Sequence, residues 1–269
     1  MRTLGIGLAA GAMLALASIG TAKAVPTATV NGVTFPVGIV AGGNQIQSGV
    51  LEENVITAVG QTLMGVGNVD NIRPTALALP VWSNGDNGKT LAFTFTNFTS
   101  STVIAPSGGN AGTVNFTGGT VNFYTLPFGT ALAGHGTIQD DINFIAANGT
   151  LWLSENAAVT NGAGETLLST IPSTGSLDNF SFASGSGALD VTGGAAGGNF
   201  NTNTFANSVT GGNDDQLLSS TFSTGAADPE FGISGTAFVK ANAVVPEPAS
   251  LALLGAGLLT LGFVKRRRA

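Results

Sequence analysis

The clearest pattern in the chain is an alternation of apolar and polar residues at positions 91–96. Leu91, Phe93 and Phe95 fall on one face of an extended chain, and the other face carries Ala92, Thr94 and Thr96. This period of two is typical of an antiparallel strand with one buried face. Phe98 breaks the phase, which predicts a bulge or a strand end there.

Two further patterns predict hairpins. Residues 27–37 alternate around Asn31-Gly32, a dipeptide that favours a tight turn between two strands. The triplet Val-Asn-Phe occurs at both 114–116 and 121–123, separated by four residues. This second pattern predicts a hairpin of residues 112–116 and 120–126, with both phenylalanines on its buried face.

The remaining apolar segments are short and are separated by turn residues. They predict an all-β fold, an antiparallel β-sandwich or jelly-roll-like domain that covers residues 25–241. The expected strands of its second half are residues 138–145, 150–154, 178–183, 188–191, 216–222 and 231–240.

Residues 50–63 give an ambiguous pattern. Leu51, Val55, Ala58 and Val59 are spaced as on one face of a helix, which predicts a short helix here. Residues 55–58 are equally compatible with a strand, so both interpretations stay open.

The N-terminus has the three parts of a secretory signal peptide. Arg2 precedes an uncharged apolar region, residues 4–19, and Ala22 and Ala24 fit a small-x-small cleavage site. The sequence therefore predicts a signal helix within residues 1–24 and an exported mature chain that begins at Val25.

The C-terminus contains a second apolar segment. Residues 249–264 carry no charge and would span about 24 Å as a helix, against about 30 Å for the core of a bilayer. This predicts a short transmembrane helix that inserts transiently. The basic end, residues 265–269, follows, and its cations Lys265, Arg266, Arg267 and Arg268 should remain in the cytoplasm.

A linker, residues 242–248, joins the predicted domain to this segment and contains Val245, Pro246, Glu247 and Pro248. This proline-flanked glutamate, the short apolar span and the basic cluster together resemble the PEP-CTERM sorting signal that exosortases read in Gram-negative bacteria. The resemblance implies cleavage near the motif by an exosortase-type enzyme and delivery to the outer surface or the extracellular matrix. It also implies a link to exopolysaccharide, because many members of that family occur with its production.

Charge and composition narrow the possible functions. Between Val25 and Val244 there are 14 acidic residues and 3 basic ones, so this part of the chain repels phosphate backbones and should not bind nucleic acid. Cysteine is absent, which removes disulfides, thiolate metal sites and cysteine nucleophiles.

No motif in the chain selects a catalytic site. His135 is the sole histidine, so a histidine zinc site is excluded, and no nucleophile motif accompanies it. The spacing of Asp140, Asp141, Glu155, Glu165, Asp190, Asp214 and Asp215 selects no catalytic pair of carboxylates. We therefore expect no enzymatic activity, no catalytic residues and no cofactor.

Two turn clusters offer oxygen ligands that calcium prefers. Asp86 lies within residues 84–88, and Asp214 and Asp215 close the cluster at 211–215. The alternative is that these are ordinary Asx-rich turns without a metal.

The combined prediction is an exported structural protein of the cell surface or extracellular matrix. Its expected role, taken from the resemblance, is to organise the envelope or its exopolysaccharide. One alternative is a glycan- or calcium-binding adhesion module, in which Trp82, Trp152 or Tyr124 would stack on a sugar. A secreted glycan-active enzyme is the other.

Overall fold

The computed structural model describes residues 25–38, 43–75, 77, 79–225 and 230–246. Several predicted features lie outside these residues: the signal peptide with Ala22 and Ala24, residues Glu247 and Pro248, the span 249–264 and the basic end 265–269. Within the described part of the chain, no helix combines the length and the hydropathy needed to cross a membrane.

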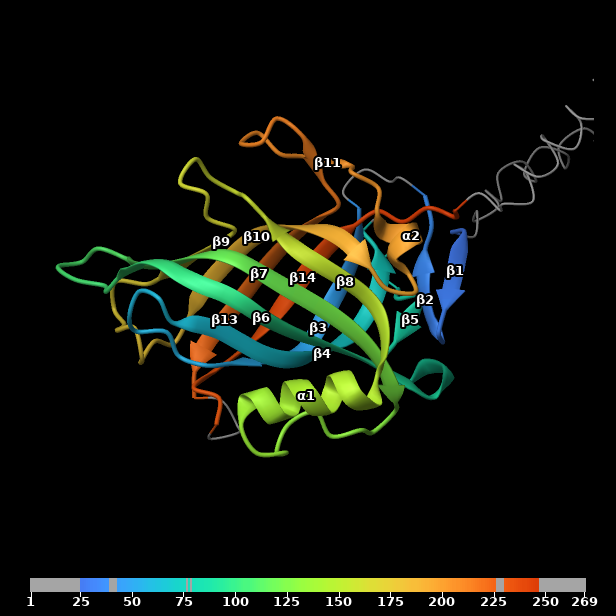
Figure 1. The fold of residues 1–269 in the computed structure, drawn as a ribbon, viewed down its shortest axis with the longest axis horizontal. Coiled ribbons are helices and arrows are strands. Elements are labelled where there is room, and N and C mark those ends of the chain that lie inside the picture. Colours follow the sequence, from blue (N-terminus) through green and yellow to red (C-terminus); the bar gives the residue numbers. More distant parts are fainter. Residues whose placement is uncertain (1–24, 39–42, 76, 78, 226–229, 247–269) are drawn as a thin grey trace, which may run out of the picture.

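Eight antiparallel strands pair in a closed ring (Figure 1). Seven of the pairings join neighbours in a row, and the eighth, between β10 and β13, returns the last strand to the first. In order around the ring the strands are β13 (Gln216–Thr224), β14 (Ile233–Ala241), β3 (Asn44–Glu53), β4 (Thr62–Pro74), β6 (Lys89–Ile104), β7 (Gly112–Pro127), β8 (Thr150–Ala158) and β10 (Ala183–Gly193).

The fold is therefore an antiparallel β-barrel, and the expected sandwich or jelly roll is wrong. The all-β class and the antiparallel pairing are confirmed. Alternating residues look the same in a sandwich and in a barrel, and only the long-range β10–β13 pairing distinguishes the two. Strand β9 (Leu167–Ile171) lies beyond the end of β8 and pairs with both β7 and β10, so it fills the same gap in the ring.

Small elements cover the barrel. The hairpin of β1 (Thr27–Val30) and β2 (Val33–Pro36) and the short helix α2 (Gly197–Phe200) lie at one end (Figure 1). Helix α1 (Ile138–Asn148) packs outside the ring, against β4, β6 and β7. The shortest elements are β5 (Trp82–Ser83), the 3-10 turn η1 (Asp86–Gly88), β11 (Phe205–Ala206) and β12 (Asn213–Asp214).

Several local predictions are confirmed. The hairpin at 27–37 turns at Asn31 and Gly32, which have φ angles of 51° and 85°. The predicted strand at 91–96 lies within β6, and the expected break near Phe98 coincides with a register shift and with a φ of 63° at Asn97. The strands expected at 150–154, 188–191, 216–222 and 231–240 also form, the last from Ile233 onward.

Four local predictions are wrong. Residues 50–63 form no helix, because β3 ends at Glu53 and β4 starts at Thr62. Residues 112–126 form one long strand rather than a hairpin, with Gly118 and Gly119 in its middle. Their positive φ angles of 67° and 115° allow a kink without a reversal. Of residues 178–183, only Ala183 belongs to a strand.

The fourth error concerns residues 138–145, which form helix α1 rather than a strand. Thr137 accepts a hydrogen bond from the backbone N–H of Asp140, and the Asp140 carboxylate accepts one in return from the backbone N–H of Thr137. This capping box satisfies two N–H groups that the first turn leaves free, so it favours a helix start. The hydrogen bonds to Thr137 also lower the pKa of Asp140.

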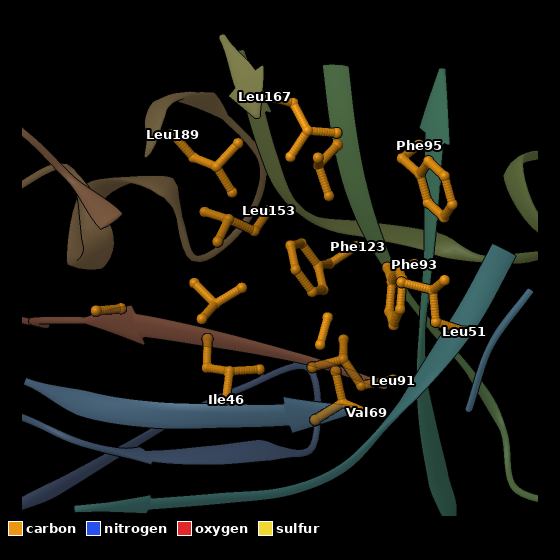
Figure 2. Close-up of a cluster of buried hydrophobic side chains, with 14 of the residues drawn as sticks. Ile46, Leu51, Val69, Leu91, Phe93, Phe95, Phe123, Leu153, Leu167 and Leu189 are labelled. Atoms are coloured by element: carbon orange, nitrogen blue, oxygen red, sulfur yellow. The ribbon is translucent and has the colours of Figure 1, made fainter. Parts of the chain in front are cut away.

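Phenylalanine rings lie over glycines of the neighbouring strand inside the barrel. Phe95 is paired in register with Gly65, and Phe93 with Gly67. A Cβ atom at either glycine would collide with the ring of its partner and with a backbone oxygen of β3. The glycines thus make room for aromatic side chains, which pack with leucines and valines from the surrounding strands (Figure 2).

Replacing Gly67 with alanine is expected to destabilise the barrel. The added Cβ would meet the Phe93 ring and the carbonyl oxygen of Val50, and overpacking of this kind costs about 1–3 kcal/mol of unfolding free energy. Urea denaturation measures the change. The control is Gly162→Ala, because a Cβ there meets no atom within 4 Å. Equal midpoints for the two variants would contradict this packing.

Candidate functional site in the barrel interior

The interior of the barrel contains two adjoining cavities of about 60 Å³ and 40 Å³. Leucine, valine, isoleucine and phenylalanine side chains form most of the wall of the larger one. The cavities have four wall residues in common: Glu53, Leu63, Leu167 and Ser220. The interior is thus apolar with a small polar spot where the two cavities meet.

Four aromatic rings close one end of the interior. Phe35 of β2 and Phe200 of α2 lie 4.8 Å apart between ring centroids, and Trp152 packs on both at 5.8 Å and 5.3 Å. Phe123 contacts Trp152 from inside the barrel. The Trp152 indole N–H donates to the carbonyl of Val30, which fixes the β1–β2 hairpin over this end.

Glu53 supplies the carboxyl group of the polar spot. Its side chain is 7% exposed and forms no hydrogen bond or ion pair with the described residues. Burial disfavours the charged form and raises the pKa of Glu53 to about 8. Glu53 is therefore mostly protonated at neutral pH, and its carboxyl group has a hydrogen to donate.

A second buried acid, Glu155, lies farther along the interior. Its two carboxyl oxygens and the amide of Gln216 are fully buried, and none of these atoms has a hydrogen-bond partner in the described structure. Burial and the charges of Asp215 and Asp190 raise the pKa of Glu155 well above its usual value, while the nearby Gln216 amide acts in the opposite direction. Burial of Glu155 therefore favours its protonated form.

The calcium candidates Asp214 and Asp215 are engaged in hydrogen bonds that fasten loops. Asp215 accepts from the backbone N–H groups of Thr202 and Asn203 at 2.5 Å and 2.6 Å, and from Val191 at 2.8 Å. Asp214 accepts from the side chain of Asn207 with both oxygens. Hydrogen bonds of this kind are what the alternative interpretation, an Asx-rich turn without a metal, leads us to expect.

The other calcium candidate, Asp86, accepts a hydrogen bond from the backbone N–H of Ser83 on the surface. Across the described ranges, no three histidine or acidic side chains are grouped so that they would hold a metal ion. Calcium binding at Asp86, Asp214 or Asp215 stays a prediction.

The remaining candidate residues, the histidine and three aromatic side chains, differ in their contacts and burial. His135 donates its backbone N–H to Asp141, lies 2.9 Å from the same carboxylate through Nδ1, and stacks on Phe144. Trp82 and Trp152 are 1% and 0% exposed, so neither is available to stack on a sugar outside the barrel. Tyr124 is only partly buried.

Sequence reasoning found part of this site. Glu155 is one of the acids that the sequence analysis names. The structure places it near Asp190 and Asp215, which the spacing of these residues in the sequence does not predict. Glu53 and Gln216 were missed. A signal existed for Glu53, since it follows Leu51 at a spacing of two and therefore falls on the same face of the strand.

The C-terminal end of the described chain leaves the barrel in a fixed position. Asn199 of α2 accepts a hydrogen bond at its carbonyl from the N–H of Val244, and its side chain donates to the carbonyl of Val244, each at 2.8 Å. The next residues, Val245 and Pro246, are exposed. The chain is thus held up to Val244 and accessible directly after it.

Comparison with known proteins identifies this terminal segment. Residues 244–268 match the PEP-CTERM protein-sorting motif, as their resemblance predicted. No curated protein and no solved structure matches the chain. The motif implies an exported protein that is processed by an exosortase and sorted to the cell envelope.

The two buried acids predict that stability falls as pH rises. For Glu53 the pKa is near 4.5 in the unfolded chain and about 8 in the barrel. Its destabilising effect on the folded protein is therefore absent below pH 4.5 and grows up to pH 8. The full pKa shift corresponds to a decrease in the free energy of unfolding on the order of 5 kcal/mol. Glu53→Gln is expected to be more stable than the parent at pH 9 and equal to it at pH 4, measured by urea denaturation.

Glu165 provides a control of opposite sign. Burial raises its pKa, but hydrogen bonds from Asn161, Thr102, Ser101 and Asn115 outweigh burial and lower it. Glu165 therefore stabilises the protein above its unfolded pKa and loses this effect as the pH falls. Glu165→Gln should destabilise at pH 7. If Glu53→Gln also destabilised the barrel at pH 9, Glu53 would not be an unpaired buried acid.

Proposed function

We propose that this protein is a structural component of the cell surface or extracellular matrix, with the barrel as the cargo of its sorting motif. The observation that carries the proposal is the position of the motif: it starts at Val244, the last residue that Asn199 fixes, and continues into exposed chain. A processing enzyme can reach such a segment without unfolding the barrel.

The barrel itself suits an extracellular role without disulfides. Each strand of the ring pairs on both sides, so no strand edge of the ring is free to add a strand from another molecule. Closure of the ring thus protects the protein against edge-to-edge aggregation. We take the protein to be a non-enzymatic structural component, since neither interior acid lies at an open surface.

The outer surface of the barrel supports contact with a neutral polysaccharide. Register pairs align five hydroxyl side chains across β7, β9, β10, β13 and β14: Thr113, Thr170, Ser184, Thr221 and Thr236. Part of this row borders an open groove of about 530 Å³, where Phe182 is exposed beside Ser and Thr side chains. A hydroxyl-rich groove with an aromatic ring and a single acidic residue, Glu52, on its wall fits the hydroxyl groups and apolar faces of sugars.

Mass spectrometry of cell fractions tests the sorting. In the envelope or the medium we expect a chain that begins at Val25 and lacks Lys265 to Arg268. Pro246→Ala combined with Glu247→Ala should leave the basic end in place and shift the protein to the inner-membrane fraction, while Pro80→Ala, an exposed proline outside the motif, should have no effect. A surface-located parent chain that keeps its basic end would contradict exosortase processing.

Co-sedimentation with extracellular polysaccharide from the producing cells tests the outer surface. Thr221→Val and Thr236→Val each remove one hydroxyl at nearly constant volume and should weaken binding about fivefold, since one hydrogen bond contributes about 1 kcal/mol. Thr57→Val, at an exposed loop position, is the control. Unchanged binding by both groove variants would exclude this row as the contact surface.

A further inference from the structure

The two interior cavities are large enough for a small molecule, and their volumes and adjacent positions limit which molecule can bind. A cavity needs about 10–15 Å³ to admit a water molecule, whereas an engineered apolar cavity of about 150 Å³ holds benzene. The cavities here, about 60 Å³ and 40 Å³, fall between these values and are adjacent at Glu53 and Ser220. Two small cavities that share wall residues favour a slender chain that extends from one cavity into the other, rather than a ring.

Most polar groups on the cavity walls already have partners. The Ser48 hydroxyl accepts from the N–H of Ala237, and the Ser169 hydroxyl donates to the carbonyl of Val114. The Asn54 side chain bonds to the backbone of Thr62 and Met64. The Glu53 carboxyl and the Ser220 hydroxyl make no side-chain hydrogen bond with the described residues, so both have bonding capacity to offer.

Glu53 and Ser220 therefore define one polar position in an otherwise apolar space. Apolar pockets with a few convergent polar groups are the usual form of small-molecule sites, in which the polar groups set the orientation. Gly185 contributes to the arrangement, because it pairs with Ser220 in register and a Cβ on it would collide with the Ser220 hydroxyl. An eight-stranded barrel is also wide enough to hold one small ligand.

We propose that the barrel interior binds a slender, uncharged aliphatic molecule with one carbonyl or hydroxyl oxygen, which Glu53 and Ser220 hold by hydrogen bonds. The protonated Glu53 carboxyl donates to the ligand oxygen, and Ser220 donates or accepts beside it. An anionic head group would lose its hydration without a cation to replace it, since no basic side chain of the described residues pairs with Glu53. A cationic head group would find its counter-ion only after Glu53 had released its proton into this apolar space.

The geometry also indicates where the ligand enters. The aromatic rings of Phe35, Trp152 and Phe200 close the end beneath β1, β2 and α2. Glu53 is the last residue of β3, a strand whose first residue, Asn44, donates a side-chain hydrogen bond to Pro36 of β2. At about 3.3 Å per residue the polar position lies roughly 30 Å along the strand from the closed end. The ligand would therefore enter at the opposite end, where the half-buried Leu177 borders the smaller cavity beside Phe180, which is buried and packs on Phe222.

Calorimetric titration of the mature protein, purified from cells that express the full chain, tests the proposal. The probes are 2-hexanone, 1-hexanol, hexylamine and sodium hexanoate at pH 7. The ketone and the alcohol are expected to bind saturably and at least tenfold more tightly than the two charged probes. Tighter binding of hexylamine or hexanoate, or no saturable binding by any probe, would overturn the proposal.

Three variants assign the site. Glu53→Leu should weaken 2-hexanone about fivefold to tenfold, while Glu53→Gln, which keeps a hydrogen-bond donor, should stay within about twofold. Ala237→Leu fills the larger cavity and should abolish binding, with circular dichroism to verify the fold. If Ala237→Leu does not fold, Ser220→Val takes its place and should weaken the alcohol about fivefold. Identical affinities in the folded variants would place the ligand elsewhere and refute the proposal.

Discussion

The closing pair between β10 and β13 is the constraint on which the rest of the structure depends. Seven register pairs, from Ala183 with Phe222 to Leu189 with Gln216, join strands that lie about thirty residues apart in the chain. Without them the strands would form an open sheet with two unprotected edges. With them, alternate residues of each strand are directed inward, and the interior becomes a separate, mostly apolar environment.

This environment explains the unusual state of two acids. Glu53 and Glu155 lie on strand positions that closure turns inward, where burial favours their protonated forms. Both lower stability at neutral pH, and replacement by apolar residues would remove that cost. The rest of this core is built from phenylalanines over glycines and from aliphatic side chains, so these two acids are its polar exceptions. For Glu53, our proposal is that the carboxyl group binds the oxygen of a ligand where the two cavities meet.

Much of the local structure and the sorting segment could be predicted from the sequence. Asn31-Gly32 specified the first hairpin, the alternation at 91–96 specified the centre of β6, and the terminal prolines, apolar span and basic cluster specified the sorting motif. These features depend on residues close together in the chain. Helix α1 could also have been predicted, since Thr137 and Asp140 have the spacing of a capping box.

The barrel and its interior could not be predicted in the same way. Nothing in the pattern of Ala183 to Leu189 says that these residues pair with Gln216 to Phe222, and a sandwich satisfies the same alternation. Hydrogen exchange along the closing pair tests the closed barrel most directly. We expect backbone amides of residues 183–189 and 216–222 to exchange within about tenfold of those in the centre of the β6–β7 pair, because the ring opens as one unit. Exchange along the closing pair as fast as in surface loops, with β6 and β7 still protected, would show an open sheet and contradict this account.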